Sequence, residues 1–171
     1  MGGLVAQELY RRNAVRVLSL VLADTYAGWS GSLGAETTEE RLAACLRDSA
    51  LPADELVSRY LPGMHSESAP EVRGELATIM SEFHPAGFRL MARSCADADI
   101  RDLLRGIRAP TLLIWGQDDV RSPVSVAHEL QNLIPAARIV IIPGAGHLSN
   151  VEAPARFNAE VRQFCLRNTI T

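Results

Sequence analysis

Three short, almost unbroken apolar runs constrain the fold of this chain more than any other feature. They cover residues 17–24, 111–115 and 138–142. Runs of this length without alternation are typical of parallel strands that are buried on both faces. Helical patterns follow the second run near 124–134 and the third run from Pro154. Strand, helix, strand and helix in this order predict parallel βαβ units with right-handed crossovers.

Helical patterns also occupy the chain on either side of the first run. Apolar residues on one face predict a helix over 3–12, which Asn13 would end in the left-handed conformation. From residue 26 to residue 98 we expect four short amphipathic helices with no strand among them. Their signals are the capping boxes Thr37-x-x-Glu40 and Ser68-x-x-Glu71, Pro52, and the apolar residues Phe88, Leu90 and Met91. The pattern predicts an α/β protein with a helical insertion after its first strand.

Length and charge exclude several classes of protein. A chain of 171 residues is one ordinary domain with a sizeable core. A formal net charge of −3 and a pI near 5.8 give no sign of nucleic-acid binding, and the longest apolar stretch is far too short to span a membrane. Cys45, Cys95 and Cys165 are widely spaced and form no C-x-x-C pair. They favour free thiols in a reducing compartment, the cytoplasm, over a disulfide scaffold or a zinc site.

A polar loop with two aspartates follows the second apolar run directly. Its sequence is Gly116-Gln117-Asp118-Asp119-Val120-Arg121-Ser122-Pro123. A carboxylate at the end of a strand can accept a hydrogen bond from an imidazole Nδ1–H and so fix the tautomer of a histidine. Aspartates after a strand are also common as caps of the next helix. The residues alone leave both interpretations open.

A histidine follows the third apolar run after a turn of small residues. Pro143-Gly144-Ala145-Gly146 allows the backbone to bend sharply before His147. A lone histidine in a loop is usually structural or solvated. This one, however, lies one strand–helix–strand unit after the paired aspartates, and adjacent parallel strands end at the same edge of a sheet. We therefore expect the two loops to lie together.

Other polar residues are weaker candidates for chemistry. Asp24 also ends a strand and is an alternative position for an acid on this earlier loop, but we favour its interpretation as a structural strand end before the inserted helices. Ser30 lies in Gly28-Trp29-Ser30-Gly31-Ser32, which fails the pattern G-x-S-x-G at its last position and leads into a loop. The remaining candidates are the thiols Cys45, Cys95 and Cys165, which show no positioned base, and the histidines His65, His84 and His128, which we interpret as surface or packing residues.

These motifs resemble those of the α/β-hydrolase family. The acid loop matches the family pattern Gly-x-x-Asp-x-x-x-Pro, which assigns the triad acid to Asp119 and leaves Asp118 as a turn or cap residue. The segment from His147 to Glu152 is similar to the histidine segment of 3-oxoadipate enol-lactonases and related esterases, and places the base at His147. We give Glu152 no chemical role beyond supporting this segment or starting a helix. The order, acid before base, is also that of the family.

The resemblance implies a fold, a reaction and a division of the chain. The fold would be the C-terminal portion of an α/β-hydrolase, with about three parallel strands, flanking helices and an inserted helical cap. Residues 1–25 and 99–171 would form the partial core, and residues 26–98 the cap. The reaction would be hydrolysis of a small-molecule ester or lactone through a covalent intermediate. Neither a metal nor an organic cofactor would be needed.

The start of the chain departs from the family pattern. Met1-Gly2-Gly3 resembles the opening of the helix that follows the nucleophile, so the nucleophile would immediately precede Met1. The resemblance gives the backbone N–H of Met1 to the oxyanion hole. We expect a hydrolase fragment with acid and base but no nucleophile, inactive alone. The alternative is a non-catalytic binding or partner-interaction protein derived from a hydrolase. In either case the strand at 17–24 lacks a neighbour, which predicts self-association or pairing with a missing half.

Overall fold

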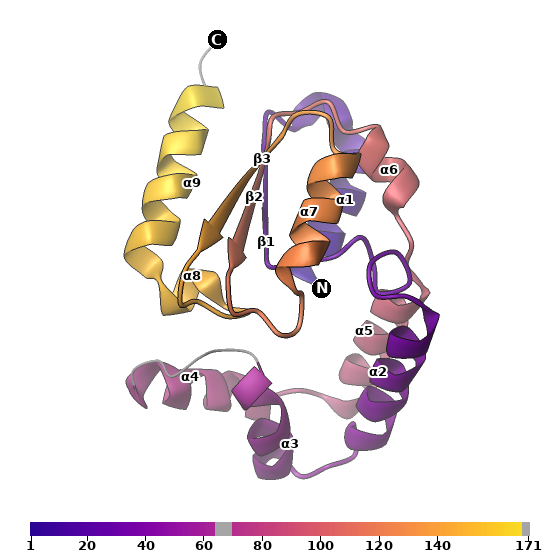
Figure 1. Ribbon diagram of the computed structural model, residues 1–171. Helices are drawn as coiled ribbons and strands as arrows, with labels where there is room; N and C mark the ends of the chain where they lie inside the picture. The colour runs from indigo at the N-terminus through magenta and orange to yellow at the C-terminus, as the bar shows by residue number, and fades with distance from the viewer. Residues whose placement is uncertain (64–69, 169–171) are drawn as a thin grey trace.

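A computed structural model describes residues 1–63 and 70–168, and its centre is a three-stranded parallel sheet (Figure 1). The strands are β1 (Leu20–Ala23), β2 (Thr111–Gly116) and β3 (Ala137–Ile142), in the order β1-β2-β3. Every residue of β2 is buried, because this strand has a neighbour on each edge and helices over both faces. The three predicted strands and their parallel arrangement are confirmed.

The first strand is shorter than the apolar run that predicted it. β1 begins at Leu20, whose amide donates to the carbonyl of Pro110 at 2.9 Å. Residues before this point have no strand to pair with, because β2 itself begins only at Thr111. Leu18 is therefore outside the strand and 68% exposed. The expected left-handed stop at Asn13 is also wrong: its φ is −140°, and the chain continues into a short 3₁₀ helix.

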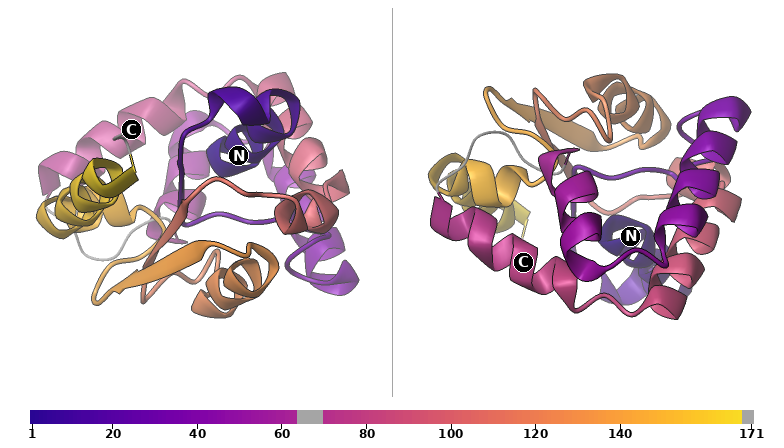
Figure 2. Two further views of the ribbon diagram at one scale, coloured as in Figure 1. Left: turned by 90° about the horizontal axis from the view of Figure 1, so that it is seen from above. Right: turned by 90° about the horizontal axis from the view of Figure 1, so that it is seen from below.

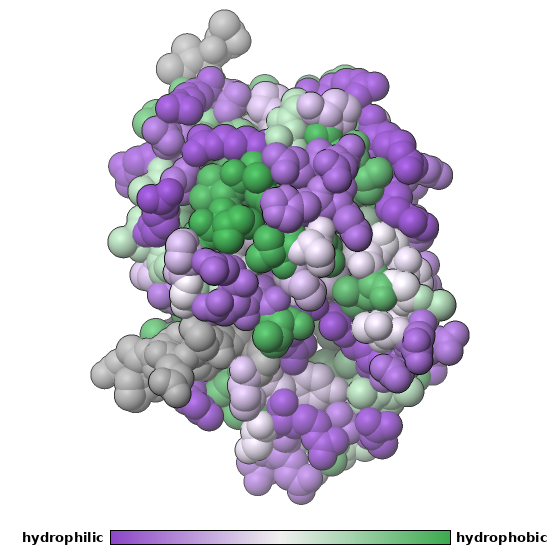
Figure 3. All heavy atoms as spheres, viewed as in Figure 1, coloured by the Kyte–Doolittle hydropathy of each residue, from purple (hydrophilic) through white to green (hydrophobic). Residues whose placement is uncertain are grey.

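Helices cover the two faces of the sheet in separate layers (Figures 1 and 2). One face packs against α1 (Gly2–Asn13), α6 (Arg101–Arg105) and α7 (Val124–Leu133), and the other against α9 (Pro154–Asn168). Alternate residues of β2 serve the two layers: Leu113 and Trp115 join the larger core, and Leu112 and Ile114 join the smaller core beneath α9. Apolar side chains reach the surface over the edge strand β3 (Figure 3), where Ile139 and Ile141 are only partly buried.

Four helices lie beyond the carboxyl ends of the strands and form the helical insertion, residues 26–98 (Figure 1). They are α2 (Ala35–Asp48), α3 (Ala53–Tyr60), which continues into a 3₁₀ turn (Leu61–Gly63), α4 (Pro70–Ser81) and α5 (Pro85–Asp97). Helix α2 begins after Gly34, whose φ of 77° suits glycine, and the box at Thr37 therefore lies inside the helix. Ser68 of the second predicted box lies outside the described residues.

Candidate active site

Three chain segments meet at the carboxyl ends of the strands. β1 ends at Ala23 and is followed by Asp24, β2 continues into the acid loop (residues 116–123), and β3 continues into the histidine loop (residues 143–149). The backbones of the last two are joined directly, since the amide of Asp118 donates to the carbonyl of Ala145 at 2.8 Å. This is the edge at which parallel sheets of α/β proteins gather their functional residues.

The contact between the acid loop and the histidine loop leaves no space for a side chain at Gly116. A Cβ atom there would lie 2.1 Å from the carbonyl oxygen of Gly146 and 2.3 Å from that of Ala145. Glycine at this position therefore permits the close approach of the two loops.

Asp119 is buried in the acid loop and uses both of its carboxylate oxygens. Oδ1 accepts hydrogen bonds from the backbone amides of Arg121 and Ser122, each at 2.8 Å. Oδ2 lies 2.9 Å from Nδ1 of His147. The structure thus brings together the two residues that the sequence predicted to be partners, although 28 positions separate them.

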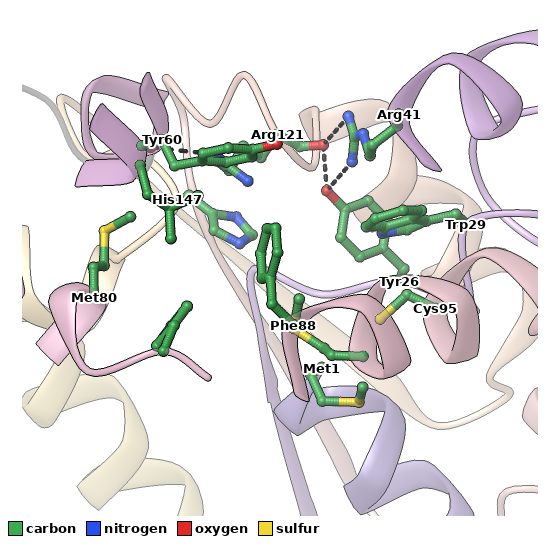
Figure 4. Close-up of a pocket in the computed structure, with 13 residues that line it drawn as sticks. Met1, Tyr26, Trp29, Arg41, Tyr60, Met80, Phe88, Cys95, Arg121 and His147 are labelled. Carbon is green, nitrogen blue, oxygen red and sulfur yellow. Dashed lines mark hydrogen bonds between the residues drawn. The ribbon is translucent and has the colours of Figure 1, made fainter. Parts of the chain in front are cut away.

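The contact with Asp119 determines the tautomer of His147. A carboxylate only accepts hydrogen bonds, so in the neutral imidazole Nδ1 carries the proton and Nε2 keeps its lone pair. The imidazole is 20% exposed and lines a pocket (Figure 4). An imidazole held in this state can take a proton from a hydroxyl or thiol and later return it to a leaving group.

Glu152 holds the backbone on either side of His147. Its carboxylate accepts hydrogen bonds from the amides of Gly146 at 2.9 Å and Leu148 at 3.2 Å. Glu152 is the last residue of the short helix α8 (Ser149–Glu152), and its side chain bonds back to the histidine loop, which precedes this helix. The carboxylate supports the shape of the histidine loop, as we expected from the sequence.

Asp24 is buried and contacts both loops. Its Oδ1 accepts from the amide of Gly116 at 2.8 Å, and its Oδ2 accepts from the amide and hydroxyl of Ser149 at 3.2 and 2.5 Å. Burial raises its pKa to about 6, although the three donors act in the opposite direction. Nδ1 of His147 bonds to Asp119 instead. The geometry agrees with the structural interpretation of Asp24 and not with the role of triad acid.

A cavity of about 170 Å³ opens between the sheet and the helical insertion (Figure 4). Its wall is mainly apolar and aromatic, with most side chains coming from the insertion and His147 from the core. The lining residues are Met1, Tyr26, Trp29, Arg41, Leu56, Tyr60, Met80, Phe83, Phe88, Met91, Cys95, Arg121 and His147. The pocket can therefore surround an apolar molecule of modest size while presenting it to the imidazole.

Arg41 connects the helical insertion to the acid loop at one side of the pocket. Arg41 lies on α2, and its guanidinium donates to the hydroxyl of Tyr26 at 2.9 Å and to the backbone carbonyl of Arg121 at 3.2 Å. It also lies over the ring of Trp29, 5.4 Å from the ring centre. Figure 4 shows this cluster on one side of the view and His147 on the other, with Phe88 drawn between them. A permanently charged group thus holds the two parts of the pocket wall together.

Met1 lines the same pocket as His147. It directly precedes α1, and its carbonyl accepts the amide of Val5 at 3.1 Å as the first bond of that helix. The first turn of α1 therefore lies at the pocket that His147 also lines.

The described weaker candidates have other partners or surroundings, although Cys95 lines the same pocket as His147. Ser30 donates its hydroxyl to the carbonyl of Ala96 at 2.5 Å. His84 caps α5 through the amide of Ala86, and His128 is exposed on α7. Cys45 and Cys95 are buried, and burial raises the pKa of both thiols, whereas Cys165 is half-buried on α9. The amide of Asp118 bonds to the histidine loop. His65 lies outside the described residues.

The described residues also bear on metals and membranes. Among the side chains that the structure describes, no three of His, Cys, Asp or Glu lie close enough together to hold a metal ion. Within the same part of the chain, no helix is both long and apolar enough to cross a membrane.

The comparison with protein families decides the classification. Residues 1–160 match the model of the alpha/beta hydrolase family. The chain belongs to this family. The partial hydrolase fold predicted from the acid and histidine motifs is confirmed by that match and by solved structures that cover 97% of the chain.

Relatives of known name show the same relationship. The chain is 28% identical to 3-oxoadipate enol-lactonase 2 of Acinetobacter baylyi over 94% of its length and 59% of the relative's. A thermophilic esterase of Thermogutta terrifontis superposes with a TM-score of 0.84 at 29% identity (97% of this chain, 62% of the other). The enol-lactonase of Burkholderia xenovorans LB400 gives 0.87 at 25% identity (97% and 63%). The chain spans about three fifths of the length of the proteins it matches.

The sequence did not reveal the arginines of the pocket. Arg121 lies two positions after Asp119, and its guanidinium lies over the ring of Tyr60, 5.4 Å from the ring centre. Burial lowers its pKa. The position of Arg121 inside the acid loop was a usable signal. Arg41 gave none, because an arginine on an amphipathic helix is indistinguishable from a solvated one until its partners are known.

Proposed function

We propose that this alpha/beta hydrolase chain supplies the acid and base for hydrolysis of a carboxylic ester or lactone by Ser-His-Asp chemistry. The observation that carries the proposal is the 2.9 Å contact between Nδ1 of His147 and Oδ2 of Asp119 at the wall of an apolar pocket. Similarity to proteins named esterase and enol-lactonase supports the bond type. Small-molecule substrates suit a cavity of this size.

Each part of the chain has a role in this proposal. Asp119 orients the imidazole and stabilises its protonated form, and His147 transfers the proton between nucleophile, substrate and water. The backbone amide of Met1, at the first turn of α1, contributes to the oxyanion hole. Residues 26–98 act as a cap over a core formed by residues 1–25 and 99–171. The chemistry requires no cofactor.

The nucleophile is the missing component. Among the described residues, no hydroxyl or thiol is hydrogen-bonded to His147. From the resemblance of Met1-Gly2-Gly3 to the helix opening that follows the nucleophile, we propose that it comes from polypeptide outside these 171 residues and that the chain alone does not turn over esters. Without a nucleophile, acyl transfer loses both covalent catalysis and the group that the histidine would activate.

The first test is an esterase assay on the purified chain with p-nitrophenyl acetate and butyrate. We expect no turnover above background, and the same for His147→Ala. Turnover that disappears in His147→Ala would contradict the proposed inactivity and would indicate a nucleophile within the chain, with Ser30 and the thiols as the first substitutions to make.

The second test supplies the missing part. The chain is joined to the portion of the Acinetobacter baylyi enol-lactonase that it does not match, so that the relative's nucleophile faces His147. Ester or lactone hydrolysis that requires both Asp119 and His147 would support the proposed reaction. A folded chimera in which His147→Ala has no effect on rate would refute it.

The competing function is a binding or partner-interaction protein that has lost catalysis. It requires the pocket but not the proton chemistry of His147, so a folded, inactive chimera with an occupied pocket would favour it.

The thiols Cys45 and Cys95 are consistent with the cytoplasmic location that we propose on redox grounds.

A further inference from the structure

Asp24 is a buried ionisable group that the proposed acid–base pair does not use. It lies at the end of β1, in the left-handed region with φ of 45°, and it is only 7% exposed. The backbone conformation turns its carboxylate toward the neighbouring strand ends instead of toward solvent. Outside glycine, φ values of this kind are uncommon and carry a cost that surrounding contacts must offset.

The carboxylate of Asp24 is also held at a cost. Burial is the main reason that its pKa is raised to about 6, so at neutral pH the group is ionised in surroundings that disfavour charge. Three hydrogen-bond donors offset this only in part. Both the buried charge and the left-handed backbone of Asp24 lower the stability of the fold. We therefore explain Asp24 by the groups that it holds in place and not by a contribution to folding.

The three donors belong to the two loops that carry the acid–base pair. The amide of Gly116 lies three positions before Asp119, and the amide and hydroxyl of Ser149 lie two positions after His147. Ser149 is fully buried. One carboxylate thus fixes a point on each loop, close to each member of the pair.

Other contacts join these loops but do not replace this one. The bond from the amide of Asp118 to the carbonyl of Ala145 connects the ends of β2 and β3 to each other. Glu152 shapes the histidine loop from within. Asp24, in contrast, connects both loops to the end of β1 through a single carboxylate.

We propose that Asp24 is a positioning residue, which holds the acid loop and the histidine loop at the separation that lets Asp119 bond Nδ1 of His147. The proposal rests on the proposed role of that pair. It predicts that the Asp119–His147 hydrogen bond weakens when Asp24 loses one acceptor, even where the fold is retained. Asparagine in place of Asp24 is nearly isosteric, but its amide nitrogen must face one of the donors, which breaks that contact.

The experiment compares three variants of the chain with the unaltered protein. Asp24→Asn removes one acceptor, and Ser149→Ala removes one donor with a smaller effect on folding. Asp48→Asn is the matched control, because Asp48 is a buried carboxylate of the helical insertion, bonded to Arg59 and Tyr60 and to neither member of the pair. Circular dichroism selects folded variants. The readout is the low-field proton resonance of His147 Nδ1–H in NMR spectra and its rate of exchange with water.

We expect exchange of the Nδ1 proton to be at least about tenfold faster in Asp24→Asn and in Ser149→Ala, as loss of one hydrogen bond to a charged group implies, and unchanged in Asp48→Asn. Unchanged exchange in folded Asp24→Asn would overturn the proposal. If Asp24→Asn does not fold, Ser149→Ala decides in the same way. Equal acceleration in Asp48→Asn would also overturn it, since the cause would then be general loosening. Absence of the resonance from the unaltered chain would overturn the pairing itself, and the positioning role with it.

Discussion

The carboxylate of Asp119 divides its two oxygens between the backbone and His147. Oδ1 accepts two amides of its own loop, and Oδ2 lies 2.9 Å from Nδ1 of the imidazole. The same side chain therefore shapes the loop and orients the histidine. Because different atoms perform these two tasks, a substitution can separate them.

Asp119→Asn is predicted to keep the fold and change the tautomer of His147. The amide oxygen can retain the bonds from Arg121 and Ser122, whereas the amide nitrogen would then face Nδ1, which must become an acceptor. The proton moves to Nε2, where it blocks general-base action. Nitrogen chemical shifts of the ring report the tautomer directly. In an active chimera we expect a loss of rate on the order of 10⁴, and a protonated Nδ1 in the variant would contradict the prediction.

Asp24 is predicted to make stability depend on pH. Its pKa is raised from 3.8 to about 6 in the folded protein, mainly by burial and further by Asp119, while the Ser149 hydroxyl and the amides of Gly116 and Ser149 oppose the rise. The folded state therefore binds this proton more tightly than the unfolded state. The resulting stabilisation is complete below about pH 4 and is lost as the pH rises through about 6.

Urea unfolding from pH 4 to 7 measures this contribution. The free energy of unfolding of the unaltered chain should fall relative to that of Asp24→Asn by about 3 kcal/mol across the range. A difference between the two proteins that stays constant with pH would show that Asp24 titrates normally.

Gly116→Ala is predicted to destabilise the protein and displace the histidine loop. Its Cβ would overlap the carbonyls of Ala145 and Gly146, which are backbone atoms and cannot rotate away. We expect a loss of roughly 1–3 kcal/mol in urea unfolding. Gly74→Ala is the control, because Gly74 is exposed within α4 with open space around it, and alanine there should stabilise by up to about 1 kcal/mol. Equal stability of the two variants would argue against the close loop contact.

Arg41→Met is predicted to loosen the helical insertion where it contacts the acid loop. The substitution keeps much of the side-chain volume but removes the bonds to Tyr26 and the Arg121 carbonyl. Amide hydrogen exchange in α2 and in residues 119–122 should become on the order of tenfold faster. Arg93→Met, at an exposed position on α5, is the charge-matched control. Equal exchange in both variants would mean that Arg41 is not a connecting residue.

The open edge of β1 is predicted to associate with a second copy of the chain. In the sheet β1 pairs only with β2, and exposed apolar residues lie near it, with Leu18 at 68% and Leu9 at 56% exposure. Size-exclusion chromatography with light scattering should show dimers or larger species, and Leu18→Lys should shift them toward monomer. Leu166→Lys, equally apolar and exposed on α9, should not. A monomer at high concentration would contradict the prediction.

The sequence predicted the strands well because their signal is local. The runs that became β2 and β3 are almost entirely apolar, with Thr111 and Arg138 as the exceptions. The central strand β2 is buried throughout, as packing between two helical layers requires, whereas the edge strand β3 is only partly buried. The run before Asp24 was read as too long because strand length depends on the partner: β1 can start only where β2 offers a residue to pair with. The start of α2 was misplaced for a related reason, since Gly34 and Thr37 both offer plausible helix starts and packing selects one.

Two motifs, each weak alone, determined from sequence that Asp119 and His147 would be partners, because parallel strands end at one edge and the motifs follow adjacent strands. The sequence could not assign Asp24, Arg41 or Arg121. Their significance lies in contacts across long separations, such as that of Asp24 with Ser149, 125 positions away. Only the tertiary structure decides such contacts, since a buried carboxylate or guanidinium is defined by the donors and acceptors that packing brings to it, and these leave no periodic pattern along the chain.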